Sequence, residues 1–279
     1  MRVILVSYSA QGFALLHRVC ERTGRTPVAY VHARSLRPAG PTRSGAGQVA
    51  GEIVDGIPPG IDLILPGNKK ALAETLCLYG ADLVVCYGFP WKFPASALAA
   101  TRYGAVNVHT STLPKYRGPL PVHWAIRNGD PDIGVSIHRM DEEFDSGGIL
   151  VQESGIALAD DVIPDQLWSV VDTCIERLLP AALDHVADGF PGTAQREDQA
   201  SYAGWMEPGF SYVDWNHTRS RIHNQVRALR FGSSGRSGPI ADVAGERVRV
   251  LRTSVDPVGG AVAVRCADGP LWVVESLPE

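Results

Sequence analysis

The stretch that decides the fold is Tyr103-Gly104-Ala105-Val106-Asn107-Val108-His109, followed at once by Thr110-Ser111-Thr112-Leu113-Pro114. Small or apolar side chains alternate with polar ones in the first seven residues, which predicts a strand, and the run ending in proline cannot continue a central strand. Because strand side chains point to alternate faces, Asn107 and His109 are expected to project from the same face. An α/β sheet collects its chemistry at strand ends, so this stretch also predicts a reaction centre.

Asp145 lies in a turn between two further predicted strands, Ile133–Met140 and Ile149–Gln152. The first of these again alternates apolar and polar residues. Two neighbouring strand ends are therefore expected to bring Asp145 close to Asn107 and His109.

Strands alternate with helices over the rest of the first 190 residues, which is typical of a doubly wound, mostly parallel sheet of the α/β class. The first turn, Ser7–Gly12, lacks the Gly-x-Gly-x-x-Gly phosphate cradle, so a nicotinamide dinucleotide is not expected. The predicted strands are Arg2–Val6, Thr26–Val31, Asp62–Leu65 and Asp82–Tyr87, and the predicted helices are Phe13–Cys20, Lys69–Tyr79, Pro121–Asn128 and Pro164–Ala187.

Composition is that of a globular protein. With 279 residues and 45% hydrophobic content, the chain can bury one sizeable core and a second, smaller one. We expect a cytoplasmic protein, since neither a signal peptide nor a run of about twenty apolar residues is present. The five cysteines are odd in number and form no Cys-x-x-Cys pair, so we expect buried thiols and no metal site.

Taken singly, each candidate residue has an ordinary explanation. Asn107 can be a turn or capping residue, His109 a core or surface histidine, and Asp145, before Ser-Gly-Gly, a turn former. The order of the three residues in the chain and the loops around them together favour a functional role over these ordinary explanations.

The arrangement resembles the formyltransferases that use 10-formyltetrahydrofolate. The shared pattern is Asn-x-His, then Ser-x-Leu-Pro-x-Tyr-Arg-Gly-x-x-Pro, an Asn-Gly-Asp and Gly-Val-x-Ile stretch, and Met-Asp-x-x-x-Asp-Ser-Gly. The residues that carry it are Asn107, His109, Ser111, Leu113, Pro114, Tyr116, Arg117, Gly118, Pro121, Asn128, Gly129, Asp130, Gly134, Val135, Ile137, Met140, Asp141, Asp145, Ser146 and Gly147.

The resemblance implies a formyltransferase Rossmann-like fold and an enzyme in which an amine attacks a formyl carbonyl carried on folate. Asn107 would donate a hydrogen bond to the tetrahedral oxyanion. His109 would accept or relay a proton of the attacking ammonium, and Asp145 would orient the imidazole or join the relay. These three residues are the predicted catalytic residues.

The same resemblance places the folate beside the turn that closes the strand ending at Tyr87. Aromatic rings would suit stacking on a pterin, although Phe89, Trp91 and Phe93 can equally be core residues. The predicted folate contacts are Gly88, Phe89, Pro90, Met140, Asp141 and Phe144.

Three regions are predicted: a catalytic domain of residues 1–190, a linker of 191–213 and a small, β-rich, shortened OB-like domain of 214–279. Residues 33–60, rich in Gly, Pro, Ser and Arg, predict a mobile loop or a short surface excursion. In family members that act on initiator tRNA, an insertion near this point approaches the acceptor stem. Arg34, Arg37 and Arg43 could serve that end, or could be solvated loop residues.

The acceptor is the open question. The net charge of −4 gives no global attraction for a polyanion. A local cluster of arginines could be a phosphate-binding face or a solvated surface. We expect a small primary amine, such as that of an amino sugar nucleotide or a specialised metabolite. The alternatives are methionyl-tRNA, hydrolysis of the formyl folate, and a folate-binding module without turnover; the sequence does not predict an oligomeric state. The clustered arginines are Arg219, Arg221, Arg227, Arg230, Arg236, Arg247, Arg249 and Arg252.

Overall fold

The computed structural model describes residues 1–33 and 46–279. These residues form two compact units, each assembled from several stretches of chain. The first unit comprises residues 1–117, 135–153 and 172–201, and the second comprises 118–134, 154–171 and 202–279. The division into a domain of 1–190, a linker of 191–213 and a domain of 214–279 stays a prediction.

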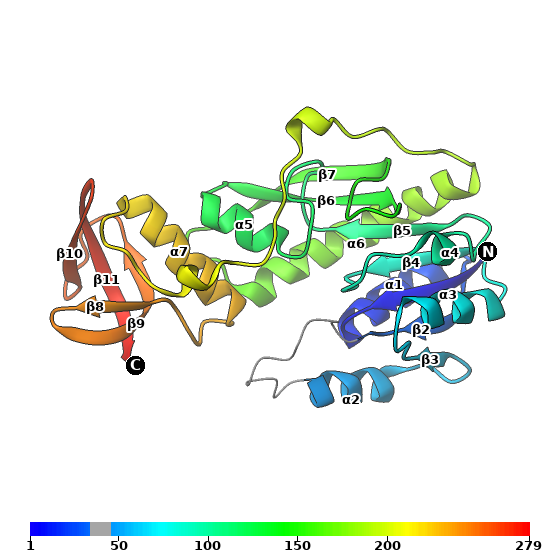
Figure 1. Ribbon diagram of the computed structural model, residues 1–279, viewed down its shortest axis with the longest axis horizontal. Coiled ribbons are helices and arrows are strands. Elements are labelled where there is room, and N and C mark those ends of the chain that lie inside the picture. The colour runs from blue at the N-terminus through cyan, green and yellow to red at the C-terminus, as the bar shows by residue number, and fades with distance from the viewer. Residues whose placement is uncertain (34–45) are drawn as a thin grey trace. The chain divides into compact units, whose positions relative to one another are not determined.

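A seven-stranded sheet runs in the order β3-β2-β1-β4-β5-β6-β7 (Figure 1). The five strands from β1 to β5 pair in parallel, and β6 pairs antiparallel to β5. The prediction of a mostly parallel sheet is therefore confirmed. The strands are β1 (Arg2–Ser7), β2 (Thr26–Val31), β3 (Asp62–Ile64), β4 (Leu83–Tyr87), β5 (Ala105–His109), β6 (Asp132–Arg139) and β7 (Ile149–Ala157).

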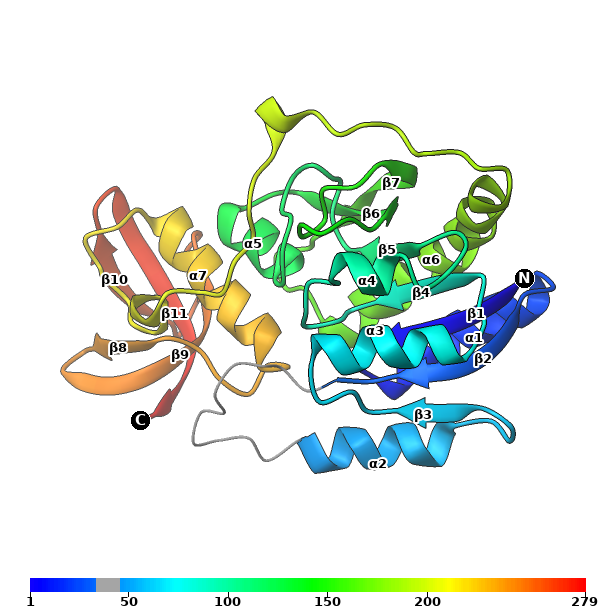
Figure 2. The same ribbon diagram turned by 45° about the vertical axis from the view of Figure 1, so that its right-hand side comes forward.

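Helices cover both faces of this sheet, which makes it doubly wound (Figures 1 and 2). On one face, Leu72 and Leu76 of α3 belong to a buried cluster with Ile4 of β1. On the other, α1 lies beside α6, where Arg18 Nε donates to Glu176 Oε1 at 3.0 Å. The helices are α1 (Ala10–Arg22), α2 (Ala46–Gly56), α3 (Lys69–Leu78), α4 (Ala95–Leu98), α5 (Pro121–Asn128) and α6 (Pro164–Ala187).

Local sequence explains where several helices begin and end. The Asn68 side chain caps α3 by accepting a hydrogen bond from the Ala71 amide at 2.9 Å. Pro121 opens α5, and Gly129 ends it in the left-handed region, as the sequence predicts. The predicted bounds of the 164–187 helix are also confirmed.

The prediction of a loop over residues 33–60 is wrong for part of this range. Helix α2 spans Ala46–Gly56, because Val49 and Ile53 recur at helical spacing and Ile53 is buried. The glycines within this helix, Gly47, Gly51 and Gly56, are exposed. Arg34, Arg37 and Arg43 lie outside the described residues.

One cysteine also departs from expectation. Cys20, Cys86, Cys174 and Cys266 are buried, whereas Cys77 is exposed. Cys77 lies in the last turn of α3, outside the helix face whose side chains are buried.

The second unit contains an antiparallel sheet in the order β10-β11-β9-β8, so the β-rich prediction for the tail is confirmed. That prediction does not include helix α7 (Arg219–Gly232), whose Ile222 and Val226 are buried against the sheet. The remaining elements are two short 3-10 helices, η1 (Glu197–Gln199) in the first unit and η2 (Pro208–Ser211) in the second, and the strands β8 (Ile240–Val243), β9 (Glu246–Ser254), β10 (Val262–Cys266) and β11 (Gly269–Pro278).

Candidate active site

Asn107 and His109 lie within the last three residues of β5. The register sets Asn107 opposite Cys86 of β4 and opposite His138 of β6. His109 is 6% exposed, and Asn107 is partly buried. Two polar side chains are thus held at the carboxyl end of a buried strand.

Asp145 reaches both of them from the turn between β6 and β7. Asn107 Nδ2 donates to Asp145 Oδ1 at 3.1 Å, and Asp145 Oδ2 lies 3.6 Å from His109 Nδ1. The Asp145 backbone is in the left-handed region, at φ 56°. The structure therefore brings the three predicted catalytic residues together, and their roles stay predictions.

His138 is a fourth member of this cluster that the sequence reasoning missed. Its Nε2 lies 3.3 Å from Asn107 Nδ2 and 3.4 Å from Asp145 Oδ1, and its ring is buried. Nδ1 lies 2.7 Å from the Arg139 carbonyl oxygen, so Nδ1 donates to that oxygen and Nε2 faces the Asn107 amide. The sequence feature that could have identified it is the alternation in both segments, because their antiparallel pairing sets residue 138 opposite residue 107.

The hydrogen-bond partner of His109 likewise indicates which of its ring nitrogens carries the proton. Nε2 lies 2.8 Å from the Tyr116 carbonyl oxygen, so Nε2 is the protonated nitrogen and Nδ1, facing Asp145, holds the free lone pair. Burial lowers the pKa of His109 below its ordinary value, although the Asp145 charge opposes this effect. A neutral imidazole with an available Nδ1 can accept a proton.

The turn that carries Asp145 is built by its own side chains. Asp141 Oδ1 accepts hydrogen bonds from the Glu143 amide at 3.0 Å and from Ser146 Oγ at 2.7 Å. A Cβ on Gly147 would lie 2.0 Å from the Arg139 carbonyl oxygen, so only glycine allows this close approach. The Asp141 carboxylate therefore shapes the turn, and its contact with folate stays a prediction.

The two predicted folate-binding segments meet beside the site. Lys92, from the segment after β4, pairs with Glu143 and lies 5.4 Å from the centre of the Phe144 ring. Gly88 has a φ of 73° and is covered by the Tyr8 ring. Met140 and Phe89 are partly buried against the core beneath both segments.

The aromatic residues of this region divide into two groups. Trp91 and Phe93 are buried in the core cluster and support Phe89 edge-on, with ring centres 5.3 Å apart in each case. Of these three rings, Phe89 alone is partly accessible for stacking on a ligand. The alternative that these rings are core residues therefore holds for Trp91 and Phe93.

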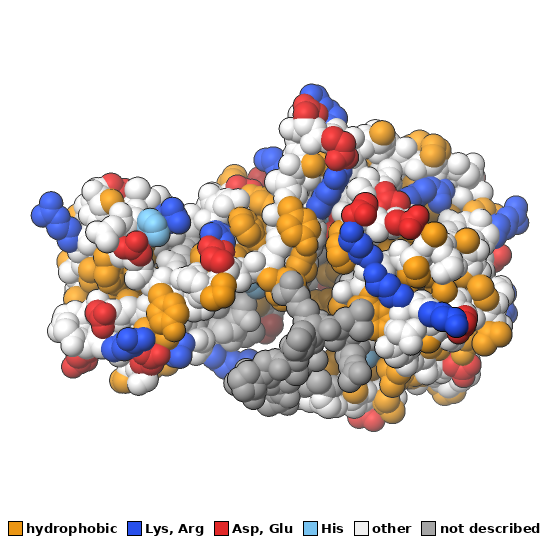
Figure 3. Space-filling model, viewed as in Figure 1, with side chains coloured by type: hydrophobic (Ala, Val, Ile, Leu, Met, Phe, Trp, Pro, Cys, Tyr) orange, Lys and Arg blue, Asp and Glu red, His pale blue; other side chains and the backbone are white. Residues whose placement is uncertain are grey.

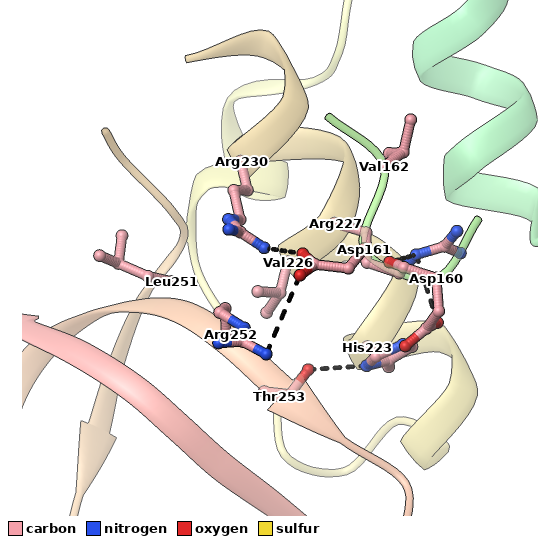
Figure 4. Close-up of a pocket in the computed structure, with 10 residues that line it drawn as sticks. All are labelled: Asp160, Asp161, Val162, His223, Val226, Arg227, Arg230, Leu251, Arg252 and Thr253. Atoms are coloured by element: carbon pink, nitrogen blue, oxygen red, sulfur yellow. Dashed lines mark hydrogen bonds and ion pairs between the residues drawn. The ribbon is translucent and has the colours of Figure 1, made fainter. Parts of the chain in front are cut away.

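A cavity of about 50 Å³ lies in the second unit, between the 160–162 segment, α7 and β9 (Figure 4). Figure 4 shows Asp161 between Arg230 and Arg252, with which it pairs. His223 bridges Asp160 and Thr253 at 2.8 Å to each. The charged groups around this cavity are therefore paired with one another.

Within residues 1–33 and 46–279, no group of three or more His, Cys, Asp or Glu side chains could hold a metal ion. No helix within them is long and apolar enough to cross a membrane.

The fold and the cluster at the end of β5 are those of an α/β enzyme. The sequence profile described as formyl transferase matches residues 1–182. A methionyl-tRNA formyltransferase from Nitratidesulfovibrio vulgaris is 32% identical over 231 residues, which cover 75% of this chain and 68% of that protein. The chain therefore belongs to the formyl transferase family.

A second relative and a solved structure extend the comparison. A methionyl-tRNA formyltransferase from Staphylococcus epidermidis is 36% identical over 159 residues, 56% of this chain and half of that protein's length. The N-formyltransferase from Helicobacter canadensis, solved with folinic acid and dTDP-3-aminofucose, superposes with a TM-score of 0.67 at 15% identity and covers 99% of both chains. The latter shows a shared fold.

Proposed function

We propose that this protein is an N-formyltransferase that moves the formyl group of 10-formyltetrahydrofolate to a primary amine of a small molecule. The observation that carries the proposal is the meeting of Asn107, His109 and Asp145 at the end of β5. Together these side chains supply an amide donor, a neutral base and a carboxylate, which are the groups that formyl transfer to an amine requires.

In the proposed reaction the amine nitrogen bonds to the formyl carbon, and the carbonyl electrons move onto oxygen. The Asn107 amide stabilises that oxyanion. His109 takes up a proton of the attacking nitrogen at Nδ1, directly or through Asp145, whose negative charge stabilises the imidazolium. Collapse of the intermediate breaks the bond between the formyl carbon and the folate nitrogen, which takes the proton held by His109 and leaves as tetrahydrofolate.

The folate is proposed to lie between the 88–93 and 140–144 segments. Support comes from their contact through Lys92 and from the partly accessible ring of Phe89. The groups proposed to contact the folate are Gly88, Phe89, Pro90, Met140, Asp141 and Phe144.

A small acceptor is favoured by the charges of the second unit. On the face of this unit drawn in Figure 3, Lys and Arg side chains lie beside Asp and Glu rather than in one basic patch. The carboxylates come from distant parts of the chain, including Asp160, Asp161 and Glu279. The arginines within ion-pair distance of a carboxylate are Arg219, Arg227, Arg230, Arg247, Arg249 and Arg252.

Methionyl-tRNA is the second candidate acceptor, because the two sequence relatives carry that name. The sugar-nucleotide class is supported by the fold match to an enzyme solved with dTDP-3-aminofucose.

The test is to incubate the protein with 10-formyltetrahydrofolate and separate acceptors while tetrahydrofolate release is followed. The acceptors are dTDP-amino sugars, other small amines, charged initiator methionyl-tRNA, and buffer alone. Formylation of a small amine but not of tRNA supports the proposal, and rapid tRNA formylation makes the second candidate correct. Release in buffer alone indicates hydrolysis, and folate binding without release from any acceptor indicates a binding module.

A further inference from the structure

Gln195 reaches the catalytic turn from a segment far away in the sequence. Its Nε2 donates to the carbonyl oxygens of Asp145 and Gly147, at 2.8 Å each. Both hydrogens of one amide thus hold the backbone on either side of Ser146. This backbone sets where the Asp145 carboxylate points.

Arg117 fixes Gln195 in turn. Its Nε and Nη2 donate to Gln195 Oε1 at 3.1 and 2.9 Å, and its Nη1 and Nη2 donate to the Glu197 carboxylate at 2.9 and 2.7 Å. The Arg117 side chain is 13% exposed. The two hydrogen bonds to Oε1 define the orientation of the Gln195 amide, because Oε1 must face arginine and Nε2 must face the turn, and the two to Glu197 hold the guanidinium in place.

The residue before Arg117 holds the other catalytic group. The Tyr116 carbonyl oxygen accepts from His109 Nε2, and the Tyr116 amide donates to Ser201 Oγ at 2.9 Å. The segment 195–201 is therefore connected to the imidazole through Tyr116 and to the backbone of the turn that carries Asp145 through Gln195.

We propose that Gln195 is a positioning residue that, together with Arg117, sets the distance between the His109 imidazole and the Asp145 carboxylate. This inference rests on the proposed function for its kinetic part only. Reacting groups tolerate little misplacement, since an error of about 1 Å can lower a rate roughly a hundredfold.

The kinetic test compares Gln195→Leu with Gln195→Glu. Glutamate keeps the length of the side chain and can pair with Arg117, but an ionised carboxylate cannot donate to the two carbonyl oxygens. Both variants are expected to lower kcat by roughly a hundredfold while KM and folate affinity change by less than about threefold. Gln199→Leu, at an exposed glutamine of the same segment, is the matched control and should keep wild-type kcat.

The opposite results overturn the inference. If Gln195→Glu keeps kcat within about threefold of wild type, pairing with Arg117 alone suffices and the two donated hydrogen bonds do not position the turn. The same holds if folate affinity falls as far as kcat. Should Gln195→Leu fail to fold, Gln195→Glu decides alone, because it preserves the shape and the arginine partner.

A second readout separates this inference from the proposed function. Nitrogen-15 NMR titration of the histidine rings, without substrate, should show a lower pKa for His109 in Gln195→Leu than in wild type. The reason is that the Asp145 charge, which raises this pKa, moves away. An unchanged or raised pKa refutes the positioning role. If wild type transfers formyl to no acceptor, the proposed function fails while this titration still decides the role of Gln195.

Discussion

Replacing Asn107 with alanine is the sharpest test of the proposed chemistry. The structure gives its amide nitrogen two partners, Asp145 and His138, at 3.1 and 3.3 Å. Losing two ordinary hydrogen bonds costs about 1–3 kcal/mol of stability. A protein stable by only about 5 kcal/mol would still be roughly 97% folded after the larger loss. Any large fall in kcat must therefore come from the reaction itself.

The expected fall in kcat is roughly 100- to 1000-fold, which is what loss of one oxyanion donor costs. Initial rates of tetrahydrofolate release give kcat, and calorimetric titration gives folate affinity, which should stay within about threefold of wild type. Asn216→Ala, at an exposed asparagine whose side-chain amide donates to nearby Asp214, is the matched control. A kcat within about threefold of wild type for Asn107→Ala would refute the donor assignment.

Three further predictions follow from the same contacts. Because burial lowers the pKa of His109 below 6.5, nitrogen-15 NMR titration of its ring should have its midpoint below pH 6.5. Asp145→Asn, which removes the charge that raises this pKa, should move the midpoint lower still; a midpoint above pH 6.5 in wild type contradicts this. Ser136→Ala should lower the free energy of unfolding by about 2–4 kcal/mol in denaturant titrations, with Ser220→Ala, at an exposed serine, as the control. The reason is that the buried Ser136 Oγ donates to the Ser111 carbonyl oxygen at 2.6 Å and accepts from Leu113 N and Gln152 Nε2 at 3.1 and 2.7 Å. Gly147→Ala should lose about 1–3 kcal/mol and most of its activity, whereas Gly209→Ala, whose Cβ meets no atom within 4 Å, should be near wild type in both measurements.

Sequence reasoning worked where the information is local. The alternation over residues 103–109 depends only on neighbouring side chains, and it predicts the strand that carries Asn107 and His109. Proline at the start of α5 and glycine at its end act through their own backbone preferences, so those bounds are predicted as well. Asp145 was identified because its turn lies between two predicted strands and matches a family pattern.

The remainder depends on contacts between distant segments. His138 becomes part of the site only when β6 pairs antiparallel to β5 in one register, and a shift of one residue would turn it to the opposite face. Gln195 lies in a polar stretch without periodicity, and its role depends on a guanidinium 78 residues away. The sequence left the arginines of the tail open between a phosphate-binding face and a solvated surface for the same reason, since the carboxylates that pair with Arg227 and Arg230 precede α7 by more than fifty residues.

The geometry of Asn107 also constrains how the proposed reaction would proceed. Both hydrogens of its amide are directed at His138 and Asp145, so an oxyanion must take one of them. If it takes the hydrogen now given to Asp145, the carboxylate loses a donor just as His109 gains a proton at Nδ1, 3.6 Å away. The freed carboxylate can then turn to accept from the imidazolium. Negative charge on the formyl oxygen and positive charge on His109 would thus be stabilised in the same step, by one exchange of hydrogen bonds. This exchange requires a turn whose backbone is held in place while the Asp145 carboxylate changes partners, and the Gln195 amide binds that backbone at the carbonyl oxygens of Asp145 and Gly147.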